Sequence, residues 1–251
     1  MYIFAAYSSW MVLHLVELPY WLAIPVSIAA TMVLGALMYQ FVLLRVRGQA
    51  LSEVIATFGI GLAILELFHY LGFVGFEYTL PVLIDGSIMI GDTMVDWQRI
   101  LATGVAGLLV AGLWAFTHYT RTGLAFRGIA QDERTALTLG IESDRMAMLS
   151  VSLGCGLSAL AASVIIPLGS ISPSEGYEVL IKALAVCIIG GLGSTGGVIV
   201  ASFLIGFAER FTDTYVSSHW TMIMSLAAIL LVLGFKPSGL FGRQKELEER
   251  I

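Results

Sequence analysis

Long stretches without a charged residue constrain the fold of this chain more than any other feature of its sequence. No charge lies between Glu17 and Arg45. Further runs of this kind cover residues 100–120, 146–174, 183–208 and 214–235, and residues 54–76 contain a single acid. A bilayer core about 30 Å thick requires roughly 20 predominantly apolar residues per helix. Because the runs do not alternate between polar and apolar residues as membrane β-strands do, they predict membrane-spanning helices.

The overall composition excludes most other classes of protein. Hydrophobic residues make up 58 % of the 251 residues and charged residues 12 %, about half the charged fraction of a typical soluble domain. Disorder is excluded because apolar residues dominate, and two cysteines exclude a disulfide scaffold. The net charge of −5 does not favour nucleic-acid binding. We therefore expect an all-α, polytopic transmembrane helical bundle, forming a single transmembrane domain over residues 1–251.

The distribution of Lys and Arg predicts the orientation of the helices. Most of the 13 basic residues lie in three places: around Arg45 and Arg47, in residues 121–145, and after Lys236. The positive-inside rule places all three, including the C-terminus, in the cytoplasm. Residues 66–96 contain acids but no Lys or Arg. Turn and strand signals there predict a small extracytoplasmic hairpin, about residues 72–98.

If Arg145 and the C-terminus are both inside, the uncharged run 146–174 must end outside and the run 214–235 must begin outside. The segment between Lys182 and Glu209 must therefore begin and end on the same side, outside. Two halves of about 13 residues would each be roughly 20 Å long, too short for a full crossing. A glycine-rich cluster lies at the centre of the segment, and its residues are Gly190, Gly191, Gly193, Ser194, Thr195 and Gly196. We therefore expect two half-helices that meet at a glycine break, as a re-entrant or discontinuous element. The alternative is one tilted helix, with the C-terminus outside.

Two enzymatic interpretations of the glycine cluster lack their structural context. The cluster matches the dinucleotide-binding pattern G-x-G-x-x-G, but apolar helix rather than a strand precedes it. Ser194 is not in a G-x-S-x-G elbow, because residue 192 is leucine. Small residues at i, i+4 spacing instead predict close helix contacts, at Gly193, Gly197 and Ala201, and at Gly154, Ser158 and Ala162. We expect no catalytic residue, metal or cofactor.

Residues 121–145 are too long for a simple connection between two spans. Apolar and charged residues alternate there with helical spacing, and Gly140 is placed to end a helix. Four arginines are balanced by four acids, which favours docking on a protein over anchoring to lipid. In such a helix we expect small residues such as Ala136 to fit a groove of the partner and charges such as Asp132 to set the register.

Several of these segments, in order along the chain, resemble the permeases of branched-chain amino acid ABC transporters. The resemblance covers Arg121-Thr-Gly-Leu-Ala-Phe-Arg-Gly-Ile-Ala-Gln-Asp with Ala136-Leu-Thr-Leu-Gly-Ile, Ile171-Ser-Pro-Ser-Glu-Gly, Lys182-Ala-Leu-Ala-Val-Cys-Ile-Ile-Gly-Gly-Leu-Gly-Ser and Phe235-Lys-Pro-Ser-Gly-Leu-Phe-Gly. In that family residues 121–140 would be the cytoplasmic coupling segment. The resemblance implies coupling residues Arg121, Gly123, Arg127, Ala130, Asp132, Ala136 and Gly140.

The family implies import of branched-chain amino acids, or of urea and short amides in close relatives. It also implies a second permease subunit, two ATP-binding subunits and an extracytoplasmic solute-binding protein, all at the inner membrane. This chain contains no P-loop motif, so ATP hydrolysis is expected on the partners. The glycine cluster would border the translocation path. The uncharged residues 1–16 resemble a stretch that follows another helix in the family, so the chain is expected to lack that N-terminal helix.

Two other classes stay open on the sequence alone. An ATPase-independent carrier or channel would need no docking partner for residues 121–140. A membrane-embedded enzyme would need convergent titratable groups, which the uncharged runs lack.

Overall fold

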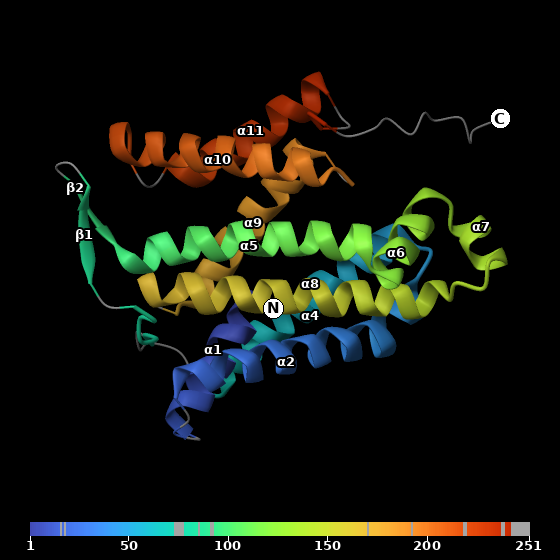
Figure 1. Ribbon diagram of the computed structural model, residues 1–251, viewed down its shortest axis with the longest axis horizontal. Coiled ribbons are helices and arrows are strands. Elements are labelled where there is room, and N and C mark those ends of the chain that lie inside the picture. Colours follow the sequence, from blue (N-terminus) through green and yellow to red (C-terminus); the bar gives the residue numbers. More distant parts are fainter. Residues whose placement is uncertain are drawn as a thin grey trace. The chain divides into compact units, whose positions relative to one another are not determined.

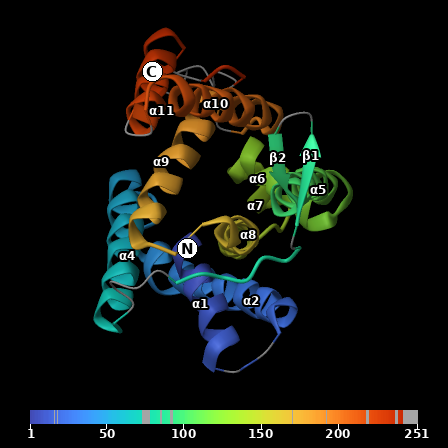
Figure 2. The same ribbon diagram turned by 90° about the vertical axis from the view of Figure 1, so that its left-hand side faces the viewer.

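The fold is described by a computed structural model. It describes residues 1–15, 17, 19–72, 78–84, 86–90, 93–169, 171–191, 193–217, 220–236 and 239–241. The elements, drawn in Figures 1 and 2, are α1 Tyr2–Leu15, α2 Tyr20–Met38, the π-helical turn η1 Tyr39–Leu43, α3 Leu44–Val46, α4 Ala50–Tyr70, β1 Ser87–Ile90, β2 Thr93–Asp96, α5 Trp97–Tyr119, α6 Arg121–Gln131, α7 Glu133–Thr138, α8 Ser143–Ile165, the 3₁₀ turn η2 Ile166–Leu168, α9 Pro173–Gly190, α10 Thr195–Tyr215 and α11 Thr221–Phe235. Contacts divide the chain into an N-terminal unit, Met1–Pro173, and a C-terminal unit, Ser174–Ile251. The expectation of one transmembrane domain stays a prediction.

The long apolar helices agree with the uncharged runs of the sequence. Within the described part of the chain, five helices are long and apolar enough to cross a membrane: Tyr20–Val46, Ser52–Tyr70, Trp97–Tyr119, Ser143–Leu168 and Thr195–Tyr215. A shorter apolar helix covers Ile223–Phe235. The prediction of an all-α polytopic membrane protein is confirmed.

The core of the N-terminal unit lies where α1, α2 and α8 pack against one another. Helix α1 is the most deeply buried of these, and its Tyr7 side chain is inaccessible to solvent. The polar groups in this core are paired, as buried polar groups must be. The Ser9 hydroxyl donates to Ser27 Oγ at 2.8 Å, and Tyr20 Oη donates to the carbonyl oxygen of Ser163 at 2.7 Å. These bonds tie the first two helices to each other and to α8.

Glycines allow α2 and α8 to approach closely. A β-carbon built on Gly35 would lie 2.6 Å from the Sγ atom of Cys155, and one on Gly156 would lie 2.7 Å from Cγ of Met32. The predicted stripe of Gly154, Ser158 and Ala162 is wrong in part, because Gly154 is exposed and a β-carbon there would meet nothing within 4 Å in the part of the chain that the structure describes. The stripe that packs on the neighbouring helix is offset from the predicted one.

The β-strands form one antiparallel hairpin in the N-terminal unit. Ser87 pairs with Asp96 and Ile90 with Thr93. The amide of Trp97 donates to the carbonyl oxygen of Gly86 at 3.1 Å and so joins the hairpin to α5. The turn at residues 91–92 lies outside the described residues. The extracytoplasmic location of the hairpin stays a prediction.

The C-terminal unit consists of α9, α10 and α11. Its buried core is formed by Ala185 and Ile189 of α9 with Ala201 and Ile205 of α10, and side chains of α11 pack on this cluster. The expected halves of about 13 residues are too short, because α9 has 18 residues and α10 has 21. Both helices continue past charged residues, and two of these, Lys182 and Glu209, form an ion pair with each other.

Candidate functional site

The segment of residues 121–140, called the coupling segment here, forms two helices rather than one. Thr120 caps α6, and its side chain accepts a hydrogen bond from the amide of Gly123 at 3.0 Å. Asp132 ends α6 and caps α7, because its Oδ1 atom accepts from the amides of Arg134 and Thr135. Gly140 then ends the segment with a positive φ of 81°. Each boundary therefore has a local cause in the sequence.

Hydrogen bonds also set the charge state of Asp132. The Thr135 hydroxyl and the amides of Thr135 and Arg134 all donate to its carboxylate, and these bonds lower its pKa below the ordinary value of 3.8. Because a charged carboxylate accepts these bonds better than a neutral one, the cap is strongest when Asp132 is ionised.

Two of the expected coupling residues face into the chain. Gly123 is buried against α5, where an added β-carbon would lie 2.2 Å from the carbonyl oxygen of Phe116. Ala136 is only 3 % exposed. The expectation that Ala136 fits a groove of a partner is therefore wrong, because its methyl group is already packed within this chain. Arg121, Ala130, Asp132 and Gly140 are exposed, and Arg127 is partly buried.

The exposed surface of the coupling segment carries three of the leucines whose spacing predicts an amphipathic helix. Leu124 and Leu137 are about half exposed, at 52 % and 51 %, and Leu139 is 76 % exposed. These exposed leucines lie on a segment that also carries exposed charges. Helical spacing identifies the segment as amphipathic, but it does not show which of its apolar residues stay exposed in the folded chain.

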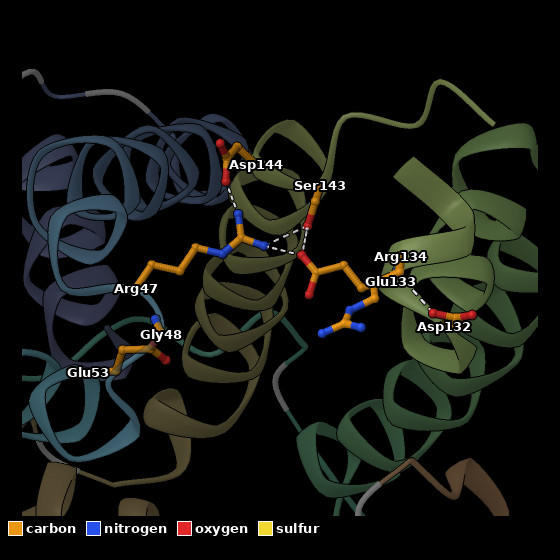
Figure 3. Close-up of polar contacts among 8 residues, drawn as sticks. All are labelled: Arg47, Gly48, Glu53, Asp132, Glu133, Arg134, Ser143 and Asp144. Atoms are coloured by element: carbon orange, nitrogen blue, oxygen red, sulfur yellow. Dashed lines mark hydrogen bonds and ion pairs between the residues drawn. The ribbon is translucent and has the colours of Figure 1, made fainter. Parts of the chain in front are cut away.

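A polar cluster joins the coupling segment to the turn between α3 and α4 (Figure 3). The guanidinium of Arg47 forms ion pairs with Glu133 of α7 and Asp144 of α8. Its Nη2 atom also donates to Ser143 Oγ at 2.7 Å, and Ser143 donates to Glu133 Oε1 at 2.5 Å. The two basic loops around Arg47 and residues 121–145 thus lie at the same end of the N-terminal unit. This is the arrangement that a common cytoplasmic location requires.

The glycine cluster forms the predicted break between two helices. Helix α9 ends at Gly190 and α10 begins at Thr195. Gly191 and Gly193 both have positive φ, 91° and 86°, which other residues adopt only with strain. The Ser194 side chain caps α10 by accepting from the Gly197 amide at 3.1 Å.

Close contact between the helix ends depends on Gly190 and Gly197, not on Gly193. A β-carbon on Gly197 would lie 2.0 Å from the carbonyl oxygen of Gly190. Gly193 and Gly196 are exposed, and a β-carbon on either would meet none of the described residues within 4 Å. The predicted contact of Gly193 with a neighbouring helix is therefore wrong, and Gly193 serves the turn through its φ angle. Thr195 is exposed and Gly191 is buried.

Residues 239–241 pack on the end of α9. The amides of Leu240 and Phe241 donate to the carbonyl oxygens of Ile189 and Gly190, at 2.8 and 3.3 Å. A β-carbon on Gly239 would lie 2.5 Å from the Cα atom of Gly191. Carbonyl groups at a helix end have no partner within the helix, and here the later segment supplies the donors. Both motifs stand out in the sequence, but their contact does not, because it joins separate segments of the chain.

The long apolar helices define a multi-pass, all-α membrane protein. Residues 1–233 match the family model described as "Branched-chain amino acid transport system / permease component". The chain belongs to this family.

Individual relatives carry the same description. The chain is 31 % identical over 173 residues to the high-affinity branched-chain amino acid transport permease BraD of Pseudomonas aeruginosa, covering 66 % of this chain and 56 % of that protein. It is 30 % identical over 173 residues to LivH of Escherichia coli K12, with the same coverage. It is 25 % identical to a probable LivH of Methanocaldococcus jannaschii, over 95 % of this chain and 81 % of that protein. The chain thus matches little more than half the length of the first two relatives. No solved structure matches it.

Proposed function

We propose that this chain is a transmembrane permease subunit of an ATP-driven importer of branched-chain amino acids or of similar small zwitterionic or amide solutes. The observation that carries the proposal is the family match over residues 1–233. The descriptions of BraD and LivH as branched-chain amino acid transport permeases support the substrate class. A transport rather than an enzymatic role is in keeping with these names.

The partners follow from the same proposal. They are a second permease subunit, two ATP-binding subunits and an extracytoplasmic solute-binding protein. The complex would lie in the inner membrane, with the C-terminus and the coupling segment in the cytoplasm. The ion pairs of Arg47 with Glu133 and Asp144 support a common side for the two basic loops.

The coupling segment is proposed as the contact with an ATP-binding subunit. Exposed leucines next to exposed charges are the chemistry of a protein interface, in which apolar anchors supply affinity and charges supply specificity. Leu124, Leu137 and Leu139 are the proposed anchors, and Arg121 and Arg134 supply exposed charge. Gly123 and Ala136 contribute indirectly, because they hold α6 and α7 against the rest of the N-terminal unit.

The glycine break is proposed to border the translocation path. Non-helical backbone at membrane depth is tolerated where it is buried in protein or lines a cavity. Gly191, Gly193, Ser194 and Thr195 present backbone and hydroxyl groups without a formal charge, which suits a neutral zwitterion or an amide. The re-entrant course of α9 and α10 belongs to the same proposal. The ion pair between Lys182 and Glu209 supports it, because residues before and after the break lie close together.

The docking proposal is tested by Leu139→Glu. In a complex purified through this chain, we expect the variant to retain much less ATP-binding subunit than the unmodified chain, because a buried charge at an apolar anchor is costly. Met94→Glu is the matched control, since Met94 is 70 % exposed and lies on the β-hairpin. Uptake of radiolabelled leucine by cells that depend on this chain tests the substrate class.

An ATPase-independent carrier is the competing function. It is favoured if Leu139→Glu and Leu137→Glu both leave leucine uptake unchanged and no ATP-binding subunit co-purifies with the unmodified chain.

A further inference from the structure

We infer that Arg47 is a positioning residue that links the coupling segment to the membrane-spanning helices of the N-terminal unit. The inference rests on the proposed function, because it assigns a role to the contacts behind the proposed docking surface. It concerns a residue outside the coupling segment and outside the glycine break.

One guanidinium group reaches elements that are far apart in the sequence. Arg47 contacts Glu133 at the start of α7, and Ser143 and Asp144 at the start of α8. These acceptors lie 86 to 97 residues further along the chain. Figure 3 shows the guanidinium between the α7 and α8 side chains. A planar group with five donors can hold several acceptors at once in a fixed geometry, which a lysine ammonium does less well.

The backbone on either side of Arg47 connects it to two spans, α4 and α2. The Gly48 amide donates to Glu53 Oε1 at 3.0 Å, and the Glu53 amide donates to the carbonyl oxygen of Gln49 at 3.0 Å. These bonds fix the turn to the first turn of α4. On the other side, α3 and the π-helical turn η1 connect Arg47 to α2 without a break in helical structure. Movement at Glu133 therefore reaches α2 and α4 through the Arg47 side chain.

The π-helical turn is a position at which α2 can bend when Arg47 moves. Residues Tyr39–Leu43 are π-helical within an otherwise α-helical span, and such turns occur mostly as local bulges at functional positions. The Tyr39 hydroxyl is buried and has no hydrogen-bond partner among the described residues. The helix therefore contains a less favourable turn between its packed part and Arg47.

The acceptors of Arg47 also allow two discrete arrangements. Glu133 lies on the coupling segment, whereas Asp144 lies on α8. If α7 moves away, Arg47 loses Glu133 but keeps Asp144, and so it is never left without a carboxylate. Because Arg47 has one mobile and one stationary partner, a change in the position of the coupling segment can alter the position of the spans.

The first test does not depend on the substrate. Backbone amide exchange with deuterium is measured on the full chain in lipid nanodiscs for Glu133→Gln and Arg47→Gln. We expect each variant to raise exchange several-fold both in residues 133–138 and in residues 39–46, because the link connects these segments. Glu142→Gln is the matched control, since Glu142 pairs with Arg145 three residues away and does not reach α7. An effect confined to the segment around the substituted residue would overturn the inference.

The second test measures coupling in the assembled complex reconstituted in proteoliposomes. We expect Arg47→Gln and Glu133→Gln to retain the ATP-binding subunits but to lower leucine uptake per ATP hydrolysed several-fold. The double variant should be no worse than the worse single variant, because both substitutions remove the same contact between Arg47 and Glu133. Arg47→Lys, which keeps the charge, should recover part of the ratio. Additive losses, or an unchanged ratio in both single variants, would contradict the inference.

The two tests separate this inference from the proposed function. Absence of leucine uptake by the unmodified complex argues against the proposed substrate, while the exchange experiment still decides the link. Loss of the ATP-binding subunits only in Leu139→Glu concerns docking and not Arg47.

Discussion

Lys182 and Glu209 lie on opposite sides of the glycine break, and the Nζ atom of Lys182 is 3.3 Å from the Oε2 atom of Glu209. The Ser225 hydroxyl of α11 donates to the other carboxylate oxygen at 3.0 Å. Glu209 is mostly buried, with 17 % of its side chain exposed. All three helices of the C-terminal unit therefore meet at one carboxylate.

Removing this carboxylate charge should destabilise the C-terminal unit. Glu209→Gln leaves the Lys182 ammonium without its partner, and we expect a loss of about 1–3 kcal/mol, reduced from that of a fully buried pair because Lys182 is partly exposed. Thermal unfolding of the purified protein in detergent measures it. Arg210→Gln is the control, because Arg210 is exposed and pairs within its own helix with Asp213. Equal unfolding temperatures in both variants would show that the pair contributes little.

The same ion pair predicts that the ends of the broken element face one side of the membrane. Single cysteines at Ser174 and Ser217, in a chain with Cys155→Ala and Cys187→Ala, should both react with a membrane-impermeant maleimide added from the periplasmic side. Labelling of Ser217→Cys only from the cytoplasmic side would contradict the re-entrant course and favour a single crossing.

Adjacent glycines at the start of α10 should respond differently to alanine. Gly197→Ala places a methyl group against the Gly190 carbonyl, and we expect it to cost about 1–3 kcal/mol and to reduce uptake. Gly196→Ala meets open space and removes a flexible residue from a helix, so it should be neutral or stabilise by about 0.4–1 kcal/mol. Unfolding temperature and leucine uptake are the measurements. If Gly196→Ala lowers the unfolding temperature and leucine uptake as much as Gly197→Ala does, the contact of Gly197 with the Gly190 carbonyl does not explain the losses.

The lowered pKa of Asp132 predicts a pH dependence of α7. A carboxyl group with a pKa lower in the folded than in the unfolded state stabilises the fold above its unfolded pKa, and this contribution is lost as pH falls through the folded pKa. Protection of the Arg134 and Thr135 amides from exchange should therefore persist down to the ordinary pKa of 3.8 and decline below it. In Asp132→Asn this pH dependence should disappear. If protection of these amides declines in the same way in Asp132→Asn, the decline results from the titration of another group.

The membrane spans and the helix break were predictable because their causes are local. Hydrophobic runs determine spans directly, and positive-φ glycines such as Gly191 interrupt helices wherever they lie. The lengths of α9 and α10 were not predictable in this way. A charge such as Lys182 usually marks the end of a span, but a partner from another helix lets the helix continue, and pairing is not local.

The contacts of the candidate site were harder to predict for the same reason. Both Gly154 and Gly156 have small residues at helical spacing, so the sequence does not distinguish them. The structure shows that Gly156 is the one that contacts the neighbouring helix. Ala136 is small enough for an interface or a core, and its burial follows from how α7 folds back. In the sequence, Arg47 is an ordinary basic residue of a loop. Its role could not be predicted because its acceptors lie far along the chain.

The close approach of α2 and α8 restricts how the protein can rearrange during a transport cycle. Gly35 receives Cys155 and Gly156 receives Met32, so each helix contributes both a recess and the side chain that fills the other. A slide by one residue would take both side chains out of their recesses at once. Sliding along the helix axis would separate both pairs, so we expect α2 and α8 to move as one unit, with any bending at the π-helical turn beyond Met38.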